Sequence, residues 1–268
     1  MESLSNVRAL IVDMDGVLWH GPQPLPGFAD FFRTLRERHL RFILATNNSS
    51  LTVDQYVAKL AGMGAHVTKD EILTSGVASA WYMAERSDPA ATRVFVIGED
   101  GLRQPLAELG FTLTDLYDVP AHYVVVGMDR GLSWDKLATA SLNIRAGATF
   151  IGTNPDRTFP TEPRIIHGNG AVLAALQTAT EVAPIIIGKP EPLMYRQAMK
   201  LLGCDPAETL AIGDRIETDI LGAVRANVRS ILLLSGVCTE KDLEGLDYRP
   251  TWVMPDICAV VEALRNGS

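Results

Sequence analysis

Short runs of apolar residues alternate along the chain with segments in which apolar residues recur at helical spacing. Apolar runs end at Val12, near Ala45 and again near Ile97, and a helical pattern follows each of them. Continuous apolar runs of this length are typical of parallel strands that are buried on both faces. Because strands alternate with helices, the pattern predicts an α/β fold with a parallel sheet.

The elements fall into three series. The first holds strands over 9–12 and 41–45 and helices over 27–38, 52–62 and 76–86. The hydrophilic segment 87–93 follows, and we place a domain boundary there. The second series holds strands in 93–98, 123–128 and 148–156, with a helix that ends at residue 109 and another over 133–146. We interpret the apolar run 185–187 as the start of a third series, with further strands in 209–214 and 230–235.

Polar residues follow four of these strands. Ligands of open α/β sheets bind beyond the carboxyl ends of the strands, so polar groups at these ends come together if the strands are neighbours. The first strand ends in two carboxylates, which repel each other unless a cation lies between them. A site with several carboxylates, a hydroxyl and an ammonium favours a hard divalent cation such as magnesium and an anionic substrate. The four groups are Asp13 and Asp15; Thr46, Asn47 and Asn48; Gly188 and Lys189; and Gly213, Asp214 and Asp219.

The composition excludes several classes of partner. The 24 basic and 32 acidic residues give a net charge of −8, which is the wrong sign for nucleic-acid binding. The apolar runs are too short to span a bilayer, so no membrane partner is expected. Residues 1–7 lack the pattern of a signal peptide, which predicts a cytoplasmic protein. The three cysteines are widely separated and indicate neither a disulfide framework nor a zinc site.

The motifs "DMDGVLW", "TNNSS", "GKPEP" and "GDRIETDI" resemble, in order and context, the four motifs of the haloacid dehalogenase (HAD) superfamily of phosphohydrolases. The similarity extends to the para-nitrophenylphosphatase or NagD-like subfamily. This resemblance implies a Rossmann-like, doubly wound parallel sheet as the core, with an inserted α/β cap domain of the C2 type. We expect the core to comprise residues 1–88 and 184–268 and the cap to comprise residues 89–183.

The resemblance also implies an activity, which is magnesium-dependent hydrolysis of small-molecule phosphate monoesters through an aspartyl-phosphate intermediate. It implies that Asp13 is the nucleophile and Asp15 the general acid and base. Mg²⁺ would be bound by Asp13, the backbone carbonyl of Asp15 and Asp214, with Asp219 in support. The residues expected to bind the phosphoryl group are Thr46, Asn47, Asn48 and Lys189. The segment 154–170 resembles the cap loop that faces the active site in this subfamily, so His167 is a candidate for contact with the leaving group.

Three alternatives remain open. A signalling receiver also gathers acids, a hydroxyl and a lysine around magnesium, but it is about half this length and has no use for Asp15 or for a cap. A dehalogenase would not need Asp15 and Asp214. A non-catalytic protein that binds magnesium and phosphate would keep every motif residue.

The related phosphatases include monomers and cap-mediated dimers, so a homodimer is also an open alternative.

Overall fold

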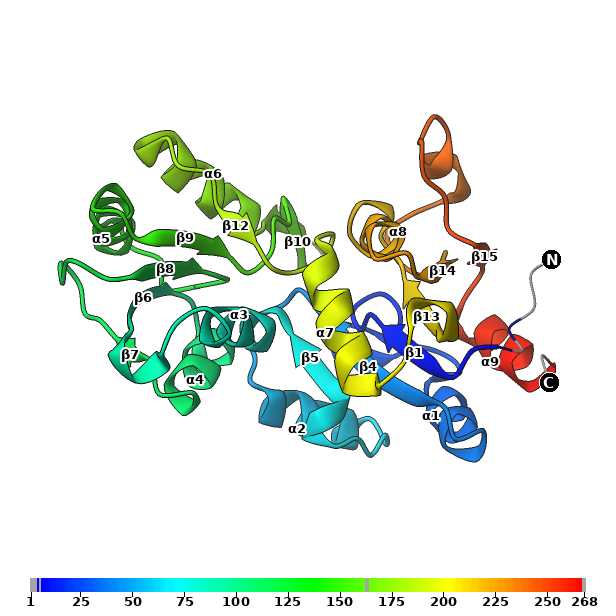
Figure 1. Ribbon diagram of the computed structural model, residues 1–268. Helices are drawn as coiled ribbons and strands as arrows, with labels where there is room; N and C mark the ends of the chain where they lie inside the picture. Colours follow the sequence, from blue (N-terminus) through cyan, green and yellow to red (C-terminus); the bar gives the residue numbers. More distant parts are fainter. Residues whose placement is uncertain (1–3, 5, 162–163, 267–268) are drawn as a thin grey trace. The chain divides into compact units, whose positions relative to one another are not determined.

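The computed structural model describes residue 4, residues 6–161 and residues 164–266 (Figure 1). The chain folds into two compact units. The first comprises the chain up to Thr46, Tyr56–Leu73 and the chain from Lys189 onward, and the second comprises Asn47–Gln55 and Thr74–Gly188. Each unit has a central sheet with helices, so the predicted α/β fold class is confirmed.

The first unit is built on a six-stranded sheet. Strand β1 lies between β13 and β4 and is parallel to both, with Val12 opposite Ile212 on one side and Leu44 on the other. All four residues of β1 are buried, as its continuous apolar run predicts. The strands in sheet order are β15 (Trp252–Met254), β14 (Arg229–Leu233), β13 (Thr209–Gly213), β1 (Ala9–Val12), β4 (Arg41–Thr46) and β5 (Ile72–Thr74).

Helices and a short hairpin complete the first unit. Helix α1 packs against α9, and α7 packs against β1, β4 and α8. The hairpin of β2 (Trp19–His20) and β3 (Gln23–Pro24) follows the first strand. The helices are α1 (Phe28–Glu37), α2 (Val53–Gly62), whose first residues belong to the second unit, α7 (Pro192–Leu202), α8 (Leu221–Arg225) and α9 (Ile257–Asn266).

The second unit has its own parallel sheet of five strands. Helix α5 packs on β6 and β8, and the buried core between them includes Phe95, Val124, Ile144 and Phe150. The strands in sheet order are β12 (Ile185–Ile186), β9 (Thr149–Gly152), β8 (Tyr123–Val126), β6 (Arg93–Ile97) and β7 (Thr112–Leu113). The other elements are α3 (Ser75–Ala84), α4 (Asp100–Glu108), α5 (Trp134–Arg145), α6 (Asn169–Thr180) and the hairpin β10 (Thr158–Thr161) and β11 (Arg164–His167).

One prediction about the order of strands is wrong. The run 185–187 does not open the series of the first unit, because β12 pairs in parallel with β9 of the second unit. Backbone bonds continue this pairing, from the N–H of Ile187 to the carbonyl of Gly152 and from the N–H of Gly188 to that of Thr153. A short apolar run does not specify which of two sheets it joins.

Helix α3 belongs to the second unit, although we expected it in the core domain. It packs against α4 at a close approach of two glycines, since a Cβ built on Gly76 would lie 2.2 Å from the carbonyl oxygen of Gly101. The boundaries of the core and cap domains at residues 88 and 183 stay a prediction.

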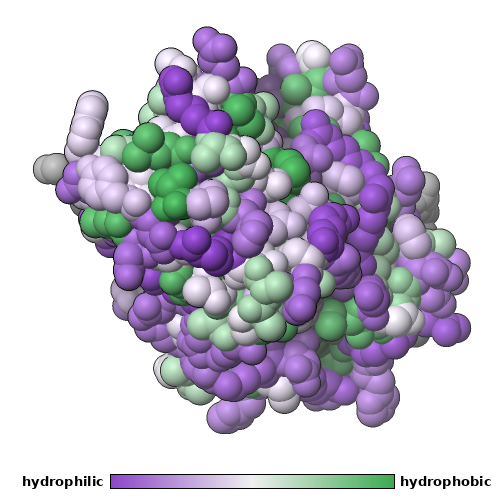
Figure 2. Space-filling view, turned by 60° about the vertical axis from the view of Figure 1, so that its left-hand side comes forward, coloured by the Kyte–Doolittle hydropathy of each residue, from purple (hydrophilic) through white to green (hydrophobic). Residues whose placement is uncertain are grey.

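Hydrophilic residues cover much of one face of the molecule (Figure 2). Figure 2 shows hydrophobic residues in separate groups between hydrophilic ones on the face that it presents. Among the residues that the structure describes, no helix has the length and apolar character needed to cross a membrane.

Candidate active site

Three neighbouring strands of the first unit end in polar residues that the sequence predicts to be functional. Asp13 directly follows β1, Thr46 is the last residue of β4, and Asp214 directly follows β13. The N–H of Asp13 donates to the carbonyl of Ile212, which extends the pairing of β1 and β13 up to the first acid. The carboxyl ends of three adjacent parallel strands therefore place these residues at one edge of the sheet.

Lys189 is the cation between the acids. Its Nζ lies 2.5 Å from Oδ1 of Asp13 and 2.6 Å from Oδ1 of Asp219, and it donates to the carbonyl of Ala45 at 3.1 Å. Lys189 precedes α7 and is only 4% exposed. Lys189 therefore reaches this edge of the sheet from the segment before a helix. The sequence had suggested instead that it follows a strand of this same sheet.

Burial shifts the pKa values of the groups at this edge. Burial raises the pKa of Asp13 well above its ordinary value; the attraction of Lys189 opposes this shift, and the repulsion of Asp219 and Asp214 adds to it. Burial and the charge of Asp219 raise the pKa of Asp214 to about 7. Burial lowers the pKa of Lys189, but the attraction of Asp13 and Asp219 outweighs it and raises that pKa well above its ordinary value. The site therefore concentrates negative charge that one ammonium does not neutralise, at a cost in folding free energy.

The acids fit a hard divalent cation. Asp13, Asp214 and Asp219 each have an oxygen within 4.8 Å of the others. Oδ1 of Asp214 is buried and has no hydrogen-bond partner among the residues described, so it is an orphaned ligand atom. Three carboxylates and one ammonium sum to a charge of −2 when all are ionised, which a divalent cation balances. An all-oxygen donor set without histidine or cysteine is typical of Mg²⁺.

Glycines leave the space that Asp214 occupies. Gly16 has a φ of +84°, and a Cβ built on it would lie 2.3 Å from Oδ2 of Asp214. A Cβ on Gly236 would lie 1.9 Å from the same oxygen. The next residue, Val237, donates its N–H to that oxygen at 3.1 Å. The loop after β14 therefore closes around Asp214, which the sequence analysis did not anticipate.

The π-helical turn Ile216–Ile220 fixes Asp219. Oδ2 of Asp219 accepts the N–H of Arg215 at 3.1 Å, and its backbone carbonyl accepts the hydroxyl of Tyr195 at 2.7 Å. Because Oδ1 accepts from Lys189, both carboxylate oxygens have protein partners. Such turns occur frequently at functional sites.

Three predicted residues, Asn47, Asn48 and His167, lie in the second unit. Asn47 donates from Nδ2 to Oδ1 of Asp156 at 3.0 Å, and Asn48 accepts the N–H and hydroxyl of Ser50 in a local turn. His167 is exposed at the end of β11. The first unit thus contains Asp13, Thr46, Lys189, Asp214 and Asp219, and the second unit contains Asn47, Asn48 and His167.

Asp15 has a partner that sequence analysis missed. It is exposed, and its Oδ1 accepts the indole N–H of Trp19 at 2.7 Å. Trp19 is fully buried and begins the β2 strand. The only signal in the sequence was the presence of a tryptophan four residues after the acid, in "DMDGVLW".

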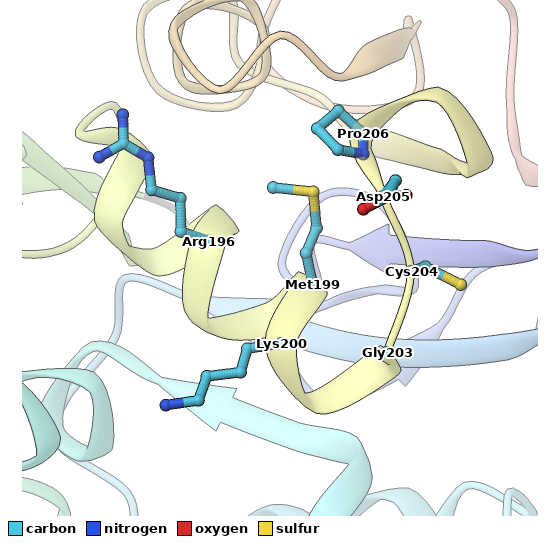
Figure 3. Close-up of a pocket in the computed structure, with 7 residues that line it drawn as sticks. All are labelled: Arg196, Met199, Lys200, Gly203, Cys204, Asp205 and Pro206. Carbon is cyan, nitrogen blue, oxygen red and sulfur yellow. The ribbon is translucent and has the colours of Figure 1, made fainter.

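A shallow pocket on α7 and the turn after it does not belong to this site. It is lined by Arg196, Met199, Lys200 and the turn 203–206 (Figure 3). That turn precedes β13, whereas Asp214 follows the carboxyl end of β13. Burial raises the pKa of the Cys204 thiol, so this pocket offers no activated nucleophile.

Comparison with known proteins agrees with this geometry. Residues 10–112 match the model of a family described as haloacid dehalogenase-like hydrolase, and residues 186–260 match a HAD-hydrolase-like family. The acid sugar phosphatase of Staphylococcus saprophyticus is 35% identical over 98% of this chain and all of its own length. The chain belongs to the haloacid dehalogenase-like hydrolases.

Solved structures show which branch of these hydrolases the chain resembles. The 4-nitrophenylphosphatase from Thermotoga maritima superposes with a TM-score of 0.92 at 32% identity, over 98% of this chain and 100% of that one. The glycerol phosphate phosphatase Rv1692 from Mycobacterium tuberculosis, solved with magnesium, has a TM-score of 0.87 at 32% identity, over 98% of this chain and 78% of that one. The predicted membership in the para-nitrophenylphosphatase branch is confirmed, and the chain is a phosphatase.

Proposed function

We propose that this phosphatase hydrolyses small phosphate monoesters in two displacements at Asp13, with Mg²⁺ bound beside it. The observation that most supports the proposal is the group Asp13, Lys189 and Asp219 next to the orphaned oxygen of Asp214. A covalent intermediate divides one difficult displacement into two easier ones. Asp13 attacks phosphorus, the ester oxygen leaves, and water then displaces Asp13.

Lys189 orients the nucleophile. Its ammonium bonds Oδ1 of Asp13 at 2.5 Å, which fixes the carboxylate and leaves Oδ2 for attack on phosphorus. The same ammonium neutralises charge on the phosphoryl oxygens, in a buried site where such interactions are strong. Asp219 accepts from Lys189 and so holds the ammonium in place.

Asp15 transfers the proton. In the first displacement it donates a proton to the leaving oxygen, and in the second it accepts a proton from the attacking water. Its exposure suits this role, because the group must reach both the ester and solvent.

Mg²⁺ would be held by a carboxylate oxygen of Asp13, the backbone carbonyl of Asp15 and Oδ1 of Asp214. When bound, the ion neutralises phosphoryl oxygens and shields the nucleophile from their repulsion. The few protein ligands suit an ion that keeps several waters.

The remaining roles concern the substrate. Thr46, together with the backbone N–H of Asn47, binds phosphoryl oxygens, with Asn48 shaping this turn through its bonds to Ser50. We assign binding of the leaving group to His167. The relatives are named acid sugar phosphatase, 4-nitrophenylphosphatase and glycerol phosphate phosphatase, and these names support a small polar or aromatic ester as the substrate.

The test measures release of para-nitrophenol from para-nitrophenyl phosphate with and without Mg²⁺, in the wild type and in Asp13→Asn. We expect magnesium-dependent turnover that Asp13→Asn abolishes. Asp205→Asn is the matched control, because Asp205 begins the one-turn helix before β13 and asparagine is an equally good N-cap. A wild type without turnover in either condition would favour the non-catalytic alternative.

A further inference from the structure

Trp19 forms a partly buried hydrogen bond to Asp15 that the proposed mechanism does not use. The indole Nε1 donates to Oδ1 of Asp15 at 2.7 Å, at the short end of the normal range. The residue is 0% exposed, whereas Asp15 is exposed. One oxygen of the exposed carboxyl is therefore tied to a rigid, buried ring.

The backbone maintains this contact. Gly16 has a φ of +84°, and its N–H donates to the carbonyl of Trp19 at 2.9 Å, while the N–H of Leu18 donates to the carbonyl of Met14 at 2.8 Å. The chain between Asp15 and Trp19 is a closed turn, and the two ends of this turn lie side by side. The contact is therefore a fixed feature of the loop after β1.

A cation lies against the same ring. Nζ of Lys59, from α2, is 4.1 Å from the centroid of the Trp19 ring. A cation over an indole face is attracted by the electrons of the ring. It draws electron density from the ring and so makes the N–H a stronger donor to the carboxylate.

We infer that Trp19 is a positioning residue that directs the transferable proton of Asp15 to Oδ2. The inference rests on the proposed role of Asp15 as general acid and base. An indole N–H is a donor only, so it stabilises Oδ1 as the acceptor and leaves Oδ2 to bear the proton. Oδ2 then gives its proton to the leaving oxygen as the ester P–O bond breaks. In the second displacement it takes a proton from water as the new P–O bond forms and the bond to Asp13 breaks.

The test separates the two displacements in Trp19→Phe. Phenylalanine keeps an aromatic ring for Lys59 and removes the N–H. Formation of the phosphoenzyme from para-nitrophenyl phosphate needs little proton transfer, because para-nitrophenolate is a good leaving group. Hydrolysis of the phosphoenzyme, and cleavage of an alkyl ester such as glycerol phosphate, need it. Rapid-quench measurements give the two rate constants separately.

We expect hydrolysis of the phosphoenzyme and kcat for the alkyl ester to fall about 10- to 100-fold, the effect of one lost hydrogen bond to a charged group. Phosphoenzyme formation from para-nitrophenyl phosphate changes less than about threefold, so phosphoenzyme accumulates. Equal losses in both displacements would show a structural role only, and no loss in either would overturn the inference.

Three further variants serve as controls. Trp252→Phe is the matched control, since Trp252 lies on the edge strand β15 and also has a cation, Arg229, 5.8 Å from its ring centroid. If Trp19→Phe does not fold, 3-benzothienylalanine at position 19 replaces the indole N–H with sulfur at nearly the same volume. Asp15→Asn is measured in parallel. If that variant hydrolyses its phosphoenzyme at the wild-type rate, the proposed role of Asp15 fails, and the failure does not come from Trp19.

Discussion

Replacing Lys189 with methionine should destabilise the protein to an extent that depends on pH. Lys189 is 4% exposed, and its ammonium bonds a backbone carbonyl and the carboxylates of Asp13 and Asp219, whose side chains are 12% and 4% exposed. Methionine fills a similar volume without charge, so Asp13 and Asp219 would remain buried without a cation. Removing one partner of a buried ion pair costs about 3–5 kcal/mol. For a unit of this size, that free energy corresponds to a fall of about 6–20 °C in the melting temperature at pH 8.

The sign of the pH effect follows from Asp13. Its folded pKa lies well above the ordinary value of 3.8, so the folded state binds a proton more tightly than the unfolded state. The contribution of Asp13 to stability is therefore most favourable below pH 4 and declines as pH rises toward the folded pKa. Loss of Lys189 raises that folded pKa further, so the destabilisation is larger at pH 8 than at pH 5, where the carboxyl is more fully protonated.

The assay is thermal unfolding followed by circular dichroism at pH 5 and pH 8 in the presence of a metal chelator. Arg225→Met is the matched control, because Arg225 pairs with Glu191 at 2.6 Å and the side chains of both residues are 41% exposed. We expect the control to change the melting temperature little at either pH. A fall in melting temperature in Lys189→Met that is the same at both pH values, or no larger than that of the control, would contradict this role of Lys189.

Three further predictions follow from the same geometry. Because the pKa of Asp214 is about 7 without metal, protons compete with Mg²⁺ for its carboxylate. The Mg²⁺ affinity measured by calorimetry should therefore fall up to about tenfold per pH unit below pH 7. An affinity that is constant from pH 5.5 to 7.5 would contradict this competition. Gly16→Ala should lower both stability and Mg²⁺ affinity, because its Cβ would collide with Asp214. Gly64→Ala, at φ +90° in open space, is the control and should cost about 1–2 kcal/mol of unfolding free energy in chemical denaturation and leave Mg²⁺ affinity unchanged. Equal effects of the two variants would argue against the collision. His167→Ala should lower kcat/KM for the best ester in a metabolite panel by about 10- to 100-fold and affect para-nitrophenyl phosphate much less; equal losses would mean that the loop does not read the leaving group.

Local sequence pattern predicted the strands and helices of the first unit well. The continuous apolar runs before Asp13 and within 41–45 are buried strands, and the helix expected over 27–38 spans Phe28–Glu37. These elements follow from side-chain periodicity within the segment itself. The polar residues at the ends of β1, β4 and β13 could be grouped because neighbouring parallel strands end at the same edge.

Long-range features were not available from that pattern. No residue within the run 185–187 indicates that it pairs with β9, so Lys189 was expected at the end of a strand of the sheet that contains β1. The bond between Trp19 and Asp15 depends on the φ of +84° at Gly16, which reverses the chain. The closure of the loop at Gly236 on Asp214 depends on a residue 22 positions away in the sequence. These contacts depend on turn geometry and tertiary packing rather than on periodicity.

In the proposed mechanism, the phosphoryl group is transferred to Asp13. The direct measurement is peptide mass spectrometry after acid quench of Asp15→Asn with para-nitrophenyl phosphate and Mg²⁺, in which hydrolysis of the intermediate should be slow. We expect one phosphoryl group on the peptide that contains Asp13, removed by hydroxylamine and absent when Asp13→Asn is added to the variant. A phosphoryl group on another peptide, or turnover by the wild type with no phosphorylated peptide in either protein, would contradict it.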